Sequence, residues 1–270
     1  MKNKITKSII TTLLMIMSFV VFGFSQTNNL STQDVPIDID EVLSEMDTIL
    51  NFGREGSISA NVSMIHKDTD GEKKARTALI YRKDKWDKMM IIFTSPLSMV
   101  GSGYLSIDRN LWYYDASSGE WIRKTKKEKY ADTDVETKDL EKNKYKPFYN
   151  WEYVGEGSVG EVDCYIIEGT AKFEDMPYPK EKVWIRKDNY LPVKEESYTV
   201  SDVLSRTAYM LHYTKLYDKK ADRYTYIDDK RLIIDNIDKT QSIREFTNIS
   251  IRDLPDSMFS KAYFVSKSGN

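Results

Sequence analysis

The hydrophobic pattern has two periods along the chain, and the first is helical. Apolar residues recur at spacings of three and four from Val42 to Phe52, as on one face of an amphipathic helix. Asp38 or Asp40 can cap this helix at its N-terminus, and Gly53 can end it. The pattern predicts a helix with one apolar face, which must cover another part of the fold.

From Gly56 onward the period changes from 3.6 to 2, which is typical of strands. SISANVSMIHK alternates apolar and polar residues, DTDG turns the chain, and KKARTALIYRK returns. The turns between later segments are too short for a crossover helix, so neighbouring strands must run antiparallel. Residues 138–149 interrupt the strands and predict a short helix or a loop across one face. The further predicted strands are DKMMIIFTSP, GSGYLSIDR, NLWYYDA, EWIRKT, WEYVGEGSVGEVDCYIIEGTA, EKVWIRKDNYLPVKEESYT, RTAYMLHYTKLY, RLIIDNIDK and QSIREFTNISI.

These elements predict a mainly β fold of the α+β class. The strands are too many for a two-layer α/β unit, and the helical material is too scarce for a bundle. A strongly curved antiparallel sheet with one or two helices on its concave side buries both the helix face and the inward side of each strand. Long apolar side chains on a frame too wide to fill would leave an apolar pocket between sheet and helix.

The N-terminal segment has the pattern of an export signal. Three lysines precede an uncharged apolar run at residues 9–24, and Gly23 and Ser25 are small residues suited to cleavage after Ser25. The alternative is an uncleaved anchor, because the run approaches the ~17 apolar residues that can just span a bilayer. No cysteine follows the cleavage site, so we expect no attached lipid. The predicted organisation is a signal peptide at 1–25, a flexible leader at 26–37 and a single domain at 38–270.

Charge and cysteine content exclude several functions. Loss of the three signal-peptide lysines leaves 37 basic and 42 acidic residues, a net charge near −5. Lysines alternate with acids along the chain, so we expect no nucleic-acid partner. The densest basic run, RKTKKEK at residues 123–129, predicts a solvated loop, with a headgroup or partner contact at a cavity mouth as the alternative. Cys164 lies in the apolar run VDCYII and predicts a buried small hydrophobe rather than a nucleophile.

No motif in the sequence indicates an enzyme. Asp68 and Asp70 precede Gly71 as in a calcium loop, but the glycine comes two positions too early, so a hairpin turn is the better interpretation. His66 and His212 lie in different predicted strands without an acidic or cysteine partner at motif spacing. We find no nucleophile elbow, metal-ligand spacing or paired carboxylates in a defined motif. We therefore expect a non-enzyme with no metal and no cofactor.

Residues 94–124 resemble a known family. TSPLSMVGSGYLSIDRNLWYYDASSGEWIRK is similar to the signature block of the outer-membrane lipoprotein-sorting proteins, the LolA-like carriers. In that block a Ser-Pro, a Gly-small-Gly turn, a Leu-Ser-Ile strand and a Leu-Trp-x-Tyr strand precede a strand with an arginine. VDCYIIEG, KVWIRKDNYLPVKEESY and LPDSMF also resemble later parts of the family, so the resemblance covers nearly the whole mature chain.

The segment DTDVETKDL, residues 132–140, corresponds to a Gly-Ser-Asp-Phe-type loop that ends in Asp-Leu in this branch of the family. Asp134, Asp139 and Leu140 keep that pattern. The residues that depart from it are Asp132, Thr133 and Val135. This departure bears most on which partner proteins the chain would bind.

The resemblance implies an incomplete β-barrel closed by a helical lid, in a periplasmic carrier of lipoprotein acyl chains or free lipid. It further implies an inner-membrane transporter and an outer-membrane acceptor as partners, and we expect a monomer. Each exposed methylene costs roughly 0.8 kcal/mol, so such a carrier needs an apolar hollow. Arg123 is expected to contact the lid or a headgroup, with a solvated arginine as the alternative. The residues expected to line the hollow are Leu43, Met46 and Leu50 from the lid helix and Ile80, Ile91, Phe93, Leu105, Ile107, Trp112, Tyr114, Ile167, Ile185 and Met210 from the strands.

Two other classes of function stay open. A periplasmic module of the same fold could sense lipid or lipoprotein, or bind a regulatory partner, without carrying it. A secreted structural β protein is the other alternative, and it predicts a filled core and no extractable lipid.

Overall fold

The structure is a computed structural model that describes residues 37–269, apart from 51–55, 85–86, 109, 126–127, 142–144 and 175. The predicted signal peptide and almost all of the predicted leader lie outside the described residues. So do Phe52 and Gly53, the expected end of the first helix. Residues 37–270 form a compact unit of their own.

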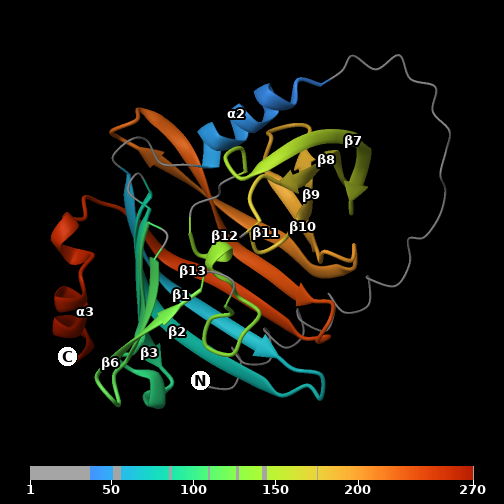
Figure 1. Cartoon of the computed structure of the whole chain (residues 1–270). Coiled ribbons are helices and arrows are strands. Elements are labelled where there is room, and N and C mark those ends of the chain that lie inside the picture. The colour runs from blue at the N-terminus through green and yellow to red at the C-terminus, as the bar shows by residue number, and fades with distance from the viewer. Residues whose placement is uncertain are drawn as a thin grey trace, which may run out of the picture. The chain divides into compact units, whose positions relative to one another are not determined.

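The described residues form two α-helices, thirteen strands and three short 3-10 helices (Figure 1). The helices are α2 (Ile39–Leu50), α3 (Lys261–Ser268), η2 (Leu97–Met99), η3 (Thr137–Asp139) and η4 (Asp256–Met258). The strands of the first half are β1 (Ser57–Lys67), β2 (Lys73–Lys83), β3 (Lys88–Ser95), β4 (Gly103–Ile107), β5 (Asn110–Asp115) and β6 (Glu120–Lys124). Those of the second half are β7 (Tyr149–Val159), β8 (Val162–Ala171), β9 (Lys180–Arg186), β10 (Pro192–Tyr198), β11 (Leu204–Asp218), β12 (Arg223–Asp235) and β13 (Gln241–Ile251).

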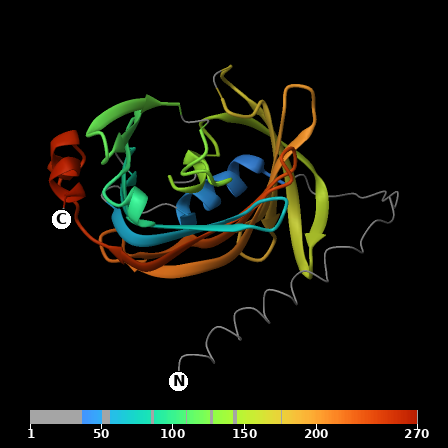
Figure 2. The same ribbon diagram turned by 90° about the horizontal axis from the view of Figure 1, so that it is seen from below.

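All thirteen strands belong to one antiparallel sheet. Its order is β6-β5-β4-β3-β2-β1-β13-β12-β11-β10-β9-β8-β7, so β1 and β13 join the two halves and β6 and β7 are the edges. The sheet curves around α2, and we call the side that faces α2 the concave face (Figure 2). This open, curved sheet confirms the predicted mainly β fold, an incomplete barrel with a helix.

Helix α2 begins where the sequence placed its cap. Asp38 Oδ1 accepts hydrogen bonds from the backbone N–H groups of Asp40 and Glu41 at 2.9 and 3.2 Å, so Asp38 rather than Asp40 is the cap. The buried face of the helix consists of Val42, Leu43, Met46 and Leu50. Among the helices of the described residues, none combines the length and apolar character needed to cross a membrane.

Strand β3 is buried on both faces. Met89, Ile91 and Phe93 pack on the concave side, whereas Met90 and Ile92 pack on the opposite, convex side. A strand of an antiparallel sheet is apolar on both faces only when something covers each of them. In this molecule the convex side of β3 is covered by α3.

Helix α3 lies outside the curve of the sheet, against the strands of the first half (Figure 2). Its Phe264 is fully buried, and the ring centroid lies 5.5 Å from that of Tyr114 and 5.1 Å from that of Trp121. Ser260 caps the helix, because its Oγ accepts a hydrogen bond from Tyr263 N at 3.2 Å. The aromatic residues of β5 and β6 thus form the base on which the C-terminal helix packs.

The Gly-Ser-Gly turn at residues 101–103 allows a close backbone contact. A Cβ on Gly103 would lie 1.9 Å from the carbonyl oxygen of Ile91 and 2.9 Å from its carbonyl carbon. Gly103→Ala should therefore force two paired strands apart and lower the free energy of unfolding by about 2–3 kcal/mol, as overpacking does. Urea denaturation measures this loss. In the control Gly157→Ala, the new Cβ meets only the flexible side chain of Ile166, whose Cδ1 lies 3.0 Å away. An equal loss in both variants would contradict this account.

Candidate functional site

The connection between β6 and β7 lies on the concave face of the sheet, and we call its residues 128–141 the plug (Figures 1 and 2). Its own backbone holds it compact: Tyr130 N donates to Val135 O at 2.7 Å, and Thr133 N donates to Tyr130 O at 3.0 Å. Glu136 and Asp139 form a capping box around η3. The interruption predicted at residues 138–149 as a short helix or a loop overlaps the plug at 138–141, where η3 ends, and β7 begins at Tyr149.

The plug packs its apolar residues onto the concave face of β1 to β5 and of β11 to β13. Tyr130, Val135 and Leu140 are fully buried, and the rings of Tyr130 and Tyr104 lie 4.2 Å apart. We call this group the plug cluster. Its members are Ile58, Ala60, Val62, Met64, Ala78, Ile80, Met89, Ile91, Phe93, Tyr104, Leu111, Tyr130, Ala131, Val135, Leu140, Ala208, Ile227, Ile233 and Phe246.

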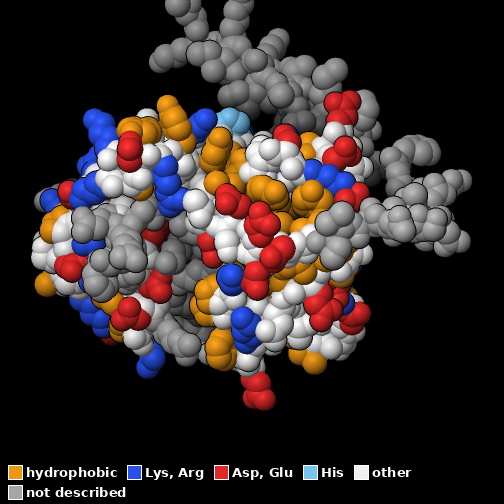
Figure 3. Space-filling model, turned by 90° about the horizontal axis from the view of Figure 1, so that it is seen from above, with side chains coloured by type: hydrophobic (Ala, Val, Ile, Leu, Met, Phe, Trp, Pro, Cys, Tyr) orange, Lys and Arg blue, Asp and Glu red, His pale blue; other side chains and the backbone are white. Residues whose placement is uncertain are grey.

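A second apolar group, the helix cluster, lies between α2 and the strands of the second half. Its members are Val42, Leu43, Met46, Leu50, Tyr145, Ile167, Val183, Ile185 and Leu191. Few polar contacts attach α2 to the rest of the chain. Thr225 Oγ1 donates to Ile49 O at 3.0 Å, and Lys146 forms a solvent-exposed ion pair with Asp40 at 3.0 Å. The outer side of α2 carries exposed acids, and Figure 3 shows acidic and hydrophobic side chains mixed on this face. Apolar contact therefore provides most of the attachment of α2.

Three buried arginines project from adjacent strands onto the same concave face. Arg206 on β11, Arg231 on β12 and Arg244 on β13 are 4%, 2% and 1% exposed. Register explains why they meet: Arg231 is opposite Arg244 on one side and Met210 on the other. A charge at this depth costs several kcal/mol unless it is paired, so each arginine needs a buried partner.

Asp139 of the plug is the partner of two of these arginines. Its Oδ2 accepts from Arg206 Nη2 at 2.5 Å, and its Oδ1 accepts from Arg231 Nη1 at 3.0 Å. The backbone N–H of Glu136 donates to the same carboxylate at 2.8 Å. Burial alone would raise the pKa of Asp139, but the two guanidinium groups outweigh it and hold this pKa far below its ordinary value. Asp139 is thus an ionised, buried carboxylate at physiological pH.

Two carboxylates of the sheet complete the network. Asp228 Oδ2 accepts from Arg231 Nε at 2.6 Å and from Arg244 Nη2 at 2.8 Å. Glu195 Oε2 accepts from Arg231 Nη1 at 3.3 Å, and its Oε1 accepts from the hydroxyl of Tyr145 at 2.5 Å. The arginine network joins the two apolar groups, because Tyr145 belongs to the helix cluster.

The plug is also attached at Asp134. Ser242 Oγ on β13 donates to Asp134 Oδ2 at 2.8 Å and accepts from Asp134 N at 2.9 Å. His66 Nδ1 lies 3.2 Å from the same carboxylate, and Thr240 Oγ1 donates to its other oxygen at 2.7 Å. Asp134 and Asp139 therefore attach the plug at two points, to β13 and to the arginines.

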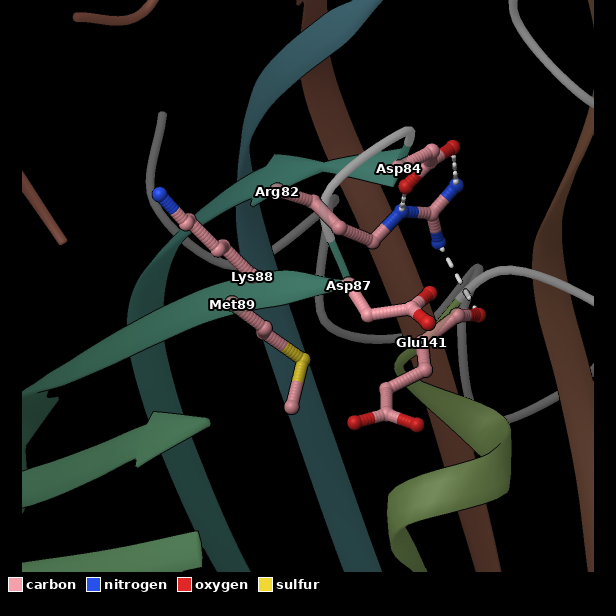
Figure 4. A pocket seen from close by; sticks show the side chains of 6 residues that line it. All are labelled: Arg82, Asp84, Asp87, Lys88, Met89 and Glu141. Atoms are coloured by element: carbon pink, nitrogen blue, oxygen red, sulfur yellow. Dashed lines mark hydrogen bonds and ion pairs between the residues drawn. The ribbon is translucent and has the colours of Figure 1, made fainter. Parts of the chain in front are cut away.

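A third attachment uses Arg82 on β2. Its Nη1 donates to the carbonyl oxygens of Leu140 and Glu141, each at 3.1 Å, and its Nε donates to Asp84 at 2.6 Å. Beside it lies a cavity of about 10 Å³, roughly the space for one water molecule. Figure 4 shows its lining residues, which are Arg82, Asp84, Asp87, Lys88, Met89 and Glu141. This small polar space belongs to the plug attachment and is too small for a lipid.

The structure distributes the predicted lining residues over three groups. Leu43, Met46, Leu50, Ile167 and Ile185 come together in the helix cluster. Ile80, Ile91 and Phe93 lie in the plug cluster, and Met210 lies on the same concave face opposite Arg231. The third group packs on the convex face beneath α3 and consists of Leu105, Ile107 and Tyr114. Trp112 lies on the same face, where Lys261 Nζ of α3 is 5.1 Å from the centroid of its ring.

Arg123 lies apart from this interior, whereas Lys129 of the basic run belongs to the plug and pairs with Asp134, Asp235 and Asp238. Arg123 is exposed on edge strand β6, where its Nη2 donates to Asn110 Oδ1 at 3.0 Å. The buried arginines 206, 231 and 244 were not singled out from the sequence. The signal was the alternation itself, because Arg206 occupies the same side of β11 as Ala208 and Met210.

The remaining chemistry of the described residues is sparse. Cys164 is buried, as expected for a small hydrophobe, and burial raises the pKa of its thiol. Within the described parts of the chain, no group of three or more histidine, cysteine or acidic side chains is arranged to hold a metal ion. The concave face offers apolar surface and buried guanidinium groups.

Comparison with known proteins agrees with this geometry. A family model described as that of an uncharacterized protein matches residues 85–266, and no curated protein matches the chain. A LolA superfamily protein from Nitrosomonas europaea has a similar structure, with 22% identity and a TM-score of 0.70, over 85% of this chain and all of the other. A DUF1329 family protein from Desulfovibrio piger has 20% identity and a TM-score of 0.73, over 83% of this chain and 96% of the other. An outer-membrane lipoprotein-sorting protein domain from Vibrio parahaemolyticus has 18% identity and a TM-score of 0.73, over 83% and 97%.

Proposed function

We propose that the chain, which has a LolA-like fold, is a periplasmic carrier or chaperone that binds lipoprotein acyl chains or another lipid. The bound chain would lie on the concave face, and the protein would take part in outer-membrane lipoprotein sorting. Export would depend on the N-terminal signal peptide expected at residues 1–25. The proposed role is binding and release without catalysis.

The observation that carries this proposal is how the apolar concave face is covered. Two short elements, α2 and the plug, cover it, whereas a filled sandwich would place a second sheet there. Leu43, Met46 and Leu50 attach α2 to the sheet by apolar contact. A hydrocarbon chain can cover the same apolar surface of the sheet when α2 moves away. Each methylene that leaves water contributes about 0.8 kcal/mol, so an acyl chain can offset displacement of the helix.

The position of the predicted lining residues fits this role. Ile167 and Ile185 form the floor beneath α2, and Val183 between them is fully buried. Ile80, Ile91 and Phe93 would line the continuation beneath the plug. We propose that a hydrocarbon chain enters by displacing α2, the plug or both, since these elements cover the apolar face.

A variant on the inner face of α2 tests the proposal. Leu43→Asp should prevent α2 from closing over a bound chain and weaken the affinity for a dansyl-labelled fatty acid by about ten-fold, which corresponds to about 1.4 kcal/mol. Fluorescence titration of the purified protein measures the affinity. Thr48→Asp, on the exposed side of the same helix, should bind like the wild type.

Mass spectrometry of organic extracts supplies an independent test. Protein purified from its native envelope should release lipid in stoichiometric amount. A protein that carries no lipid and does not bind the dansyl probe would not be a carrier, and the partner-binding module or the structural protein would then be the better description.

A further inference from the structure

We propose that the lipid bound in this interior carries an anionic headgroup, which replaces the carboxylate of Asp139 on Arg206 and Arg231. This inference rests on the carrier function proposed above and specifies its ligand. The plug would then act as an internal stand-in for the headgroup when no lipid is bound. A fatty carboxylate and a phosphate ester share the required chemistry.

The first support is the origin of the charges. Three buried arginines face three buried carboxylates, of which Glu195 and Asp228 belong to the sheet and Asp139 alone belongs to the plug. When the plug leaves, Arg231 keeps Glu195 and Asp228. Arg206 then loses Asp139, its ion-pair partner among the described residues. The guanidinium that the plug covers, and that loses its carboxylate when the plug leaves, favours binding of another anion.

Other charges near the plug do not replace this partner. Glu181 also loses a plug residue, because Lys138 Nζ donates to it at 2.5 Å. Register places Glu181 opposite Ser197, and Ser197 opposite Arg206, so Glu181 is two strands away from Arg206. The arginine cluster itself is therefore left with more positive than negative charge.

The second support is that two guanidinium N–H donors of the network lack a hydrogen-bond partner. The Nε atoms of Arg206 and Arg244 are buried and have no hydrogen-bond partner among the described residues, and one acceptor of the same network, Asp228 Oδ1, also has none. Buried donors are normally satisfied, so they mark a place where more acceptor oxygens fit than the plug supplies. A guanidinium group presents its donors as a planar fork that matches carboxylate and phosphate oxygens.

The third support is the position of the arginines between apolar surfaces. The guanidinium of Arg244 lies 4.3 Å from the ring centroid of Phe246 in the plug cluster. Glu195, the partner of Arg231, binds Tyr145 of the helix cluster. A charged group held at the arginines therefore has hydrocarbon surface beside it. This arrangement suits an amphiphile better than a free anion.

Competition between ligands of equal chain length tests the inference. Laurate, dodecyl phosphate and dodecanol should each displace the neutral probe 1-N-phenylnaphthylamine from the wild-type protein. We expect the two anions to bind about ten-fold more tightly than dodecanol, as for one charge-assisted contact. Hydrogen exchange of the plug amides should rise when laurate binds, because the plug leaves the sheet.

The double variant Arg206→Met with Asp139→Asn removes both buried charges together and so avoids an unpaired carboxylate. It should bind dodecanol at least as tightly as the wild type, because the plug is held less firmly, and it should lose the preference for the anions. The control Arg186→Met removes an arginine from an exposed pair with Asp188 and should keep the preference.

The outcomes separate this inference from the carrier function. If no compound displaces the probe and the probe itself does not bind, the carrier function fails. If dodecanol binds as tightly as laurate, the carrier function stands and the anionic headgroup is overturned. Release of the plug by millimolar inorganic phosphate alone would show a site for a free anion and would also overturn the assignment to an amphiphile.

Discussion

Asp139→Asn should weaken the attachment of the plug to the buried arginines and lower the free energy of unfolding by about 3–5 kcal/mol at pH 7. Loss of one partner of a buried ion pair leaves an uncompensated buried charge, and this charge causes the loss of stability. Here Arg206 and Arg231 both lose the carboxylate that they share. Urea denaturation measures the loss, and hydrogen exchange should locate it in residues 128–141 before the strands open.

The matched control is Asp188→Asn. Asp188 is 62% exposed and accepts two hydrogen bonds from Arg186, so the geometry is similar and the burial is not. Exposed pairs contribute about 0–1 kcal/mol. Equal losses in the two variants would show that burial of Asp139 on the arginines does not hold the plug.

The same variant should change the response to acid. The pKa of Asp139 in the folded protein lies below its ordinary value of 3.8, so its contribution to stability is complete above that pH and is lost as the pH falls further. The difference between the wild type and Asp139→Asn should therefore be constant from pH 7 to about pH 5 and shrink below pH 4. Glu195, whose pKa is also lowered despite its burial, acts in the same direction in both proteins.

Local patterns in the sequence were sufficient for the elements of this fold. The spacing from Val42 to Leu50 and the cap at Asp38 are properties of one turn and the next, and α2 follows them. The antiparallel sheet follows from short turns between alternating segments. These signals need no knowledge of what lies opposite each residue.

The face of each strand was harder to assign. In β3 to β5 apolar residues occur on both faces, so alternation does not distinguish the concave from the convex side. The cover on the convex side is α3, whose sequence KAYFVSKS buries Phe264 but has little helical periodicity. Leu105 and Trp112 consequently lie on the side of α3, and Ile91 lies on the side of the plug.

The arginine network depends on contacts between distant parts of the chain. Asp139 is separated from Arg206 by 67 residues and from Arg231 by 92. An arginine at an inward position of β11 signals a buried partner, but the sequence does not say which loop supplies it. Asp139 and Leu140 match the family pattern, and their contacts depend on the side chains, since the carboxylate of Asp139 binds Arg206 and the side chain of Leu140 is fully buried in the plug cluster.

A disulfide between the plug and β13 should stop lipid uptake. Asp134→Cys with Ser242→Cys places two thiols where Ser242 Oγ contacts both the backbone nitrogen and the carboxylate of Asp134, at 2.9 and 2.8 Å. Cys164→Ala removes the native thiol. The covalent bond keeps the plug on the sheet, so the oxidised protein should bind the dansyl-labelled fatty acid about a hundred-fold more weakly, which corresponds to about 2.8 kcal/mol.

Reduction of the disulfide should restore binding in the same sample, which separates the lock from the substitutions themselves. The control Ser63→Cys with Thr77→Cys joins two residues that face each other on β1 and β2, away from the plug. It should bind the probe equally well when oxidised and reduced, because it ties strands that stay paired. Equal binding by the oxidised and reduced plug disulfide would show that a chain can enter with the plug in place. Displacement of α2 alone would then have to open the interior.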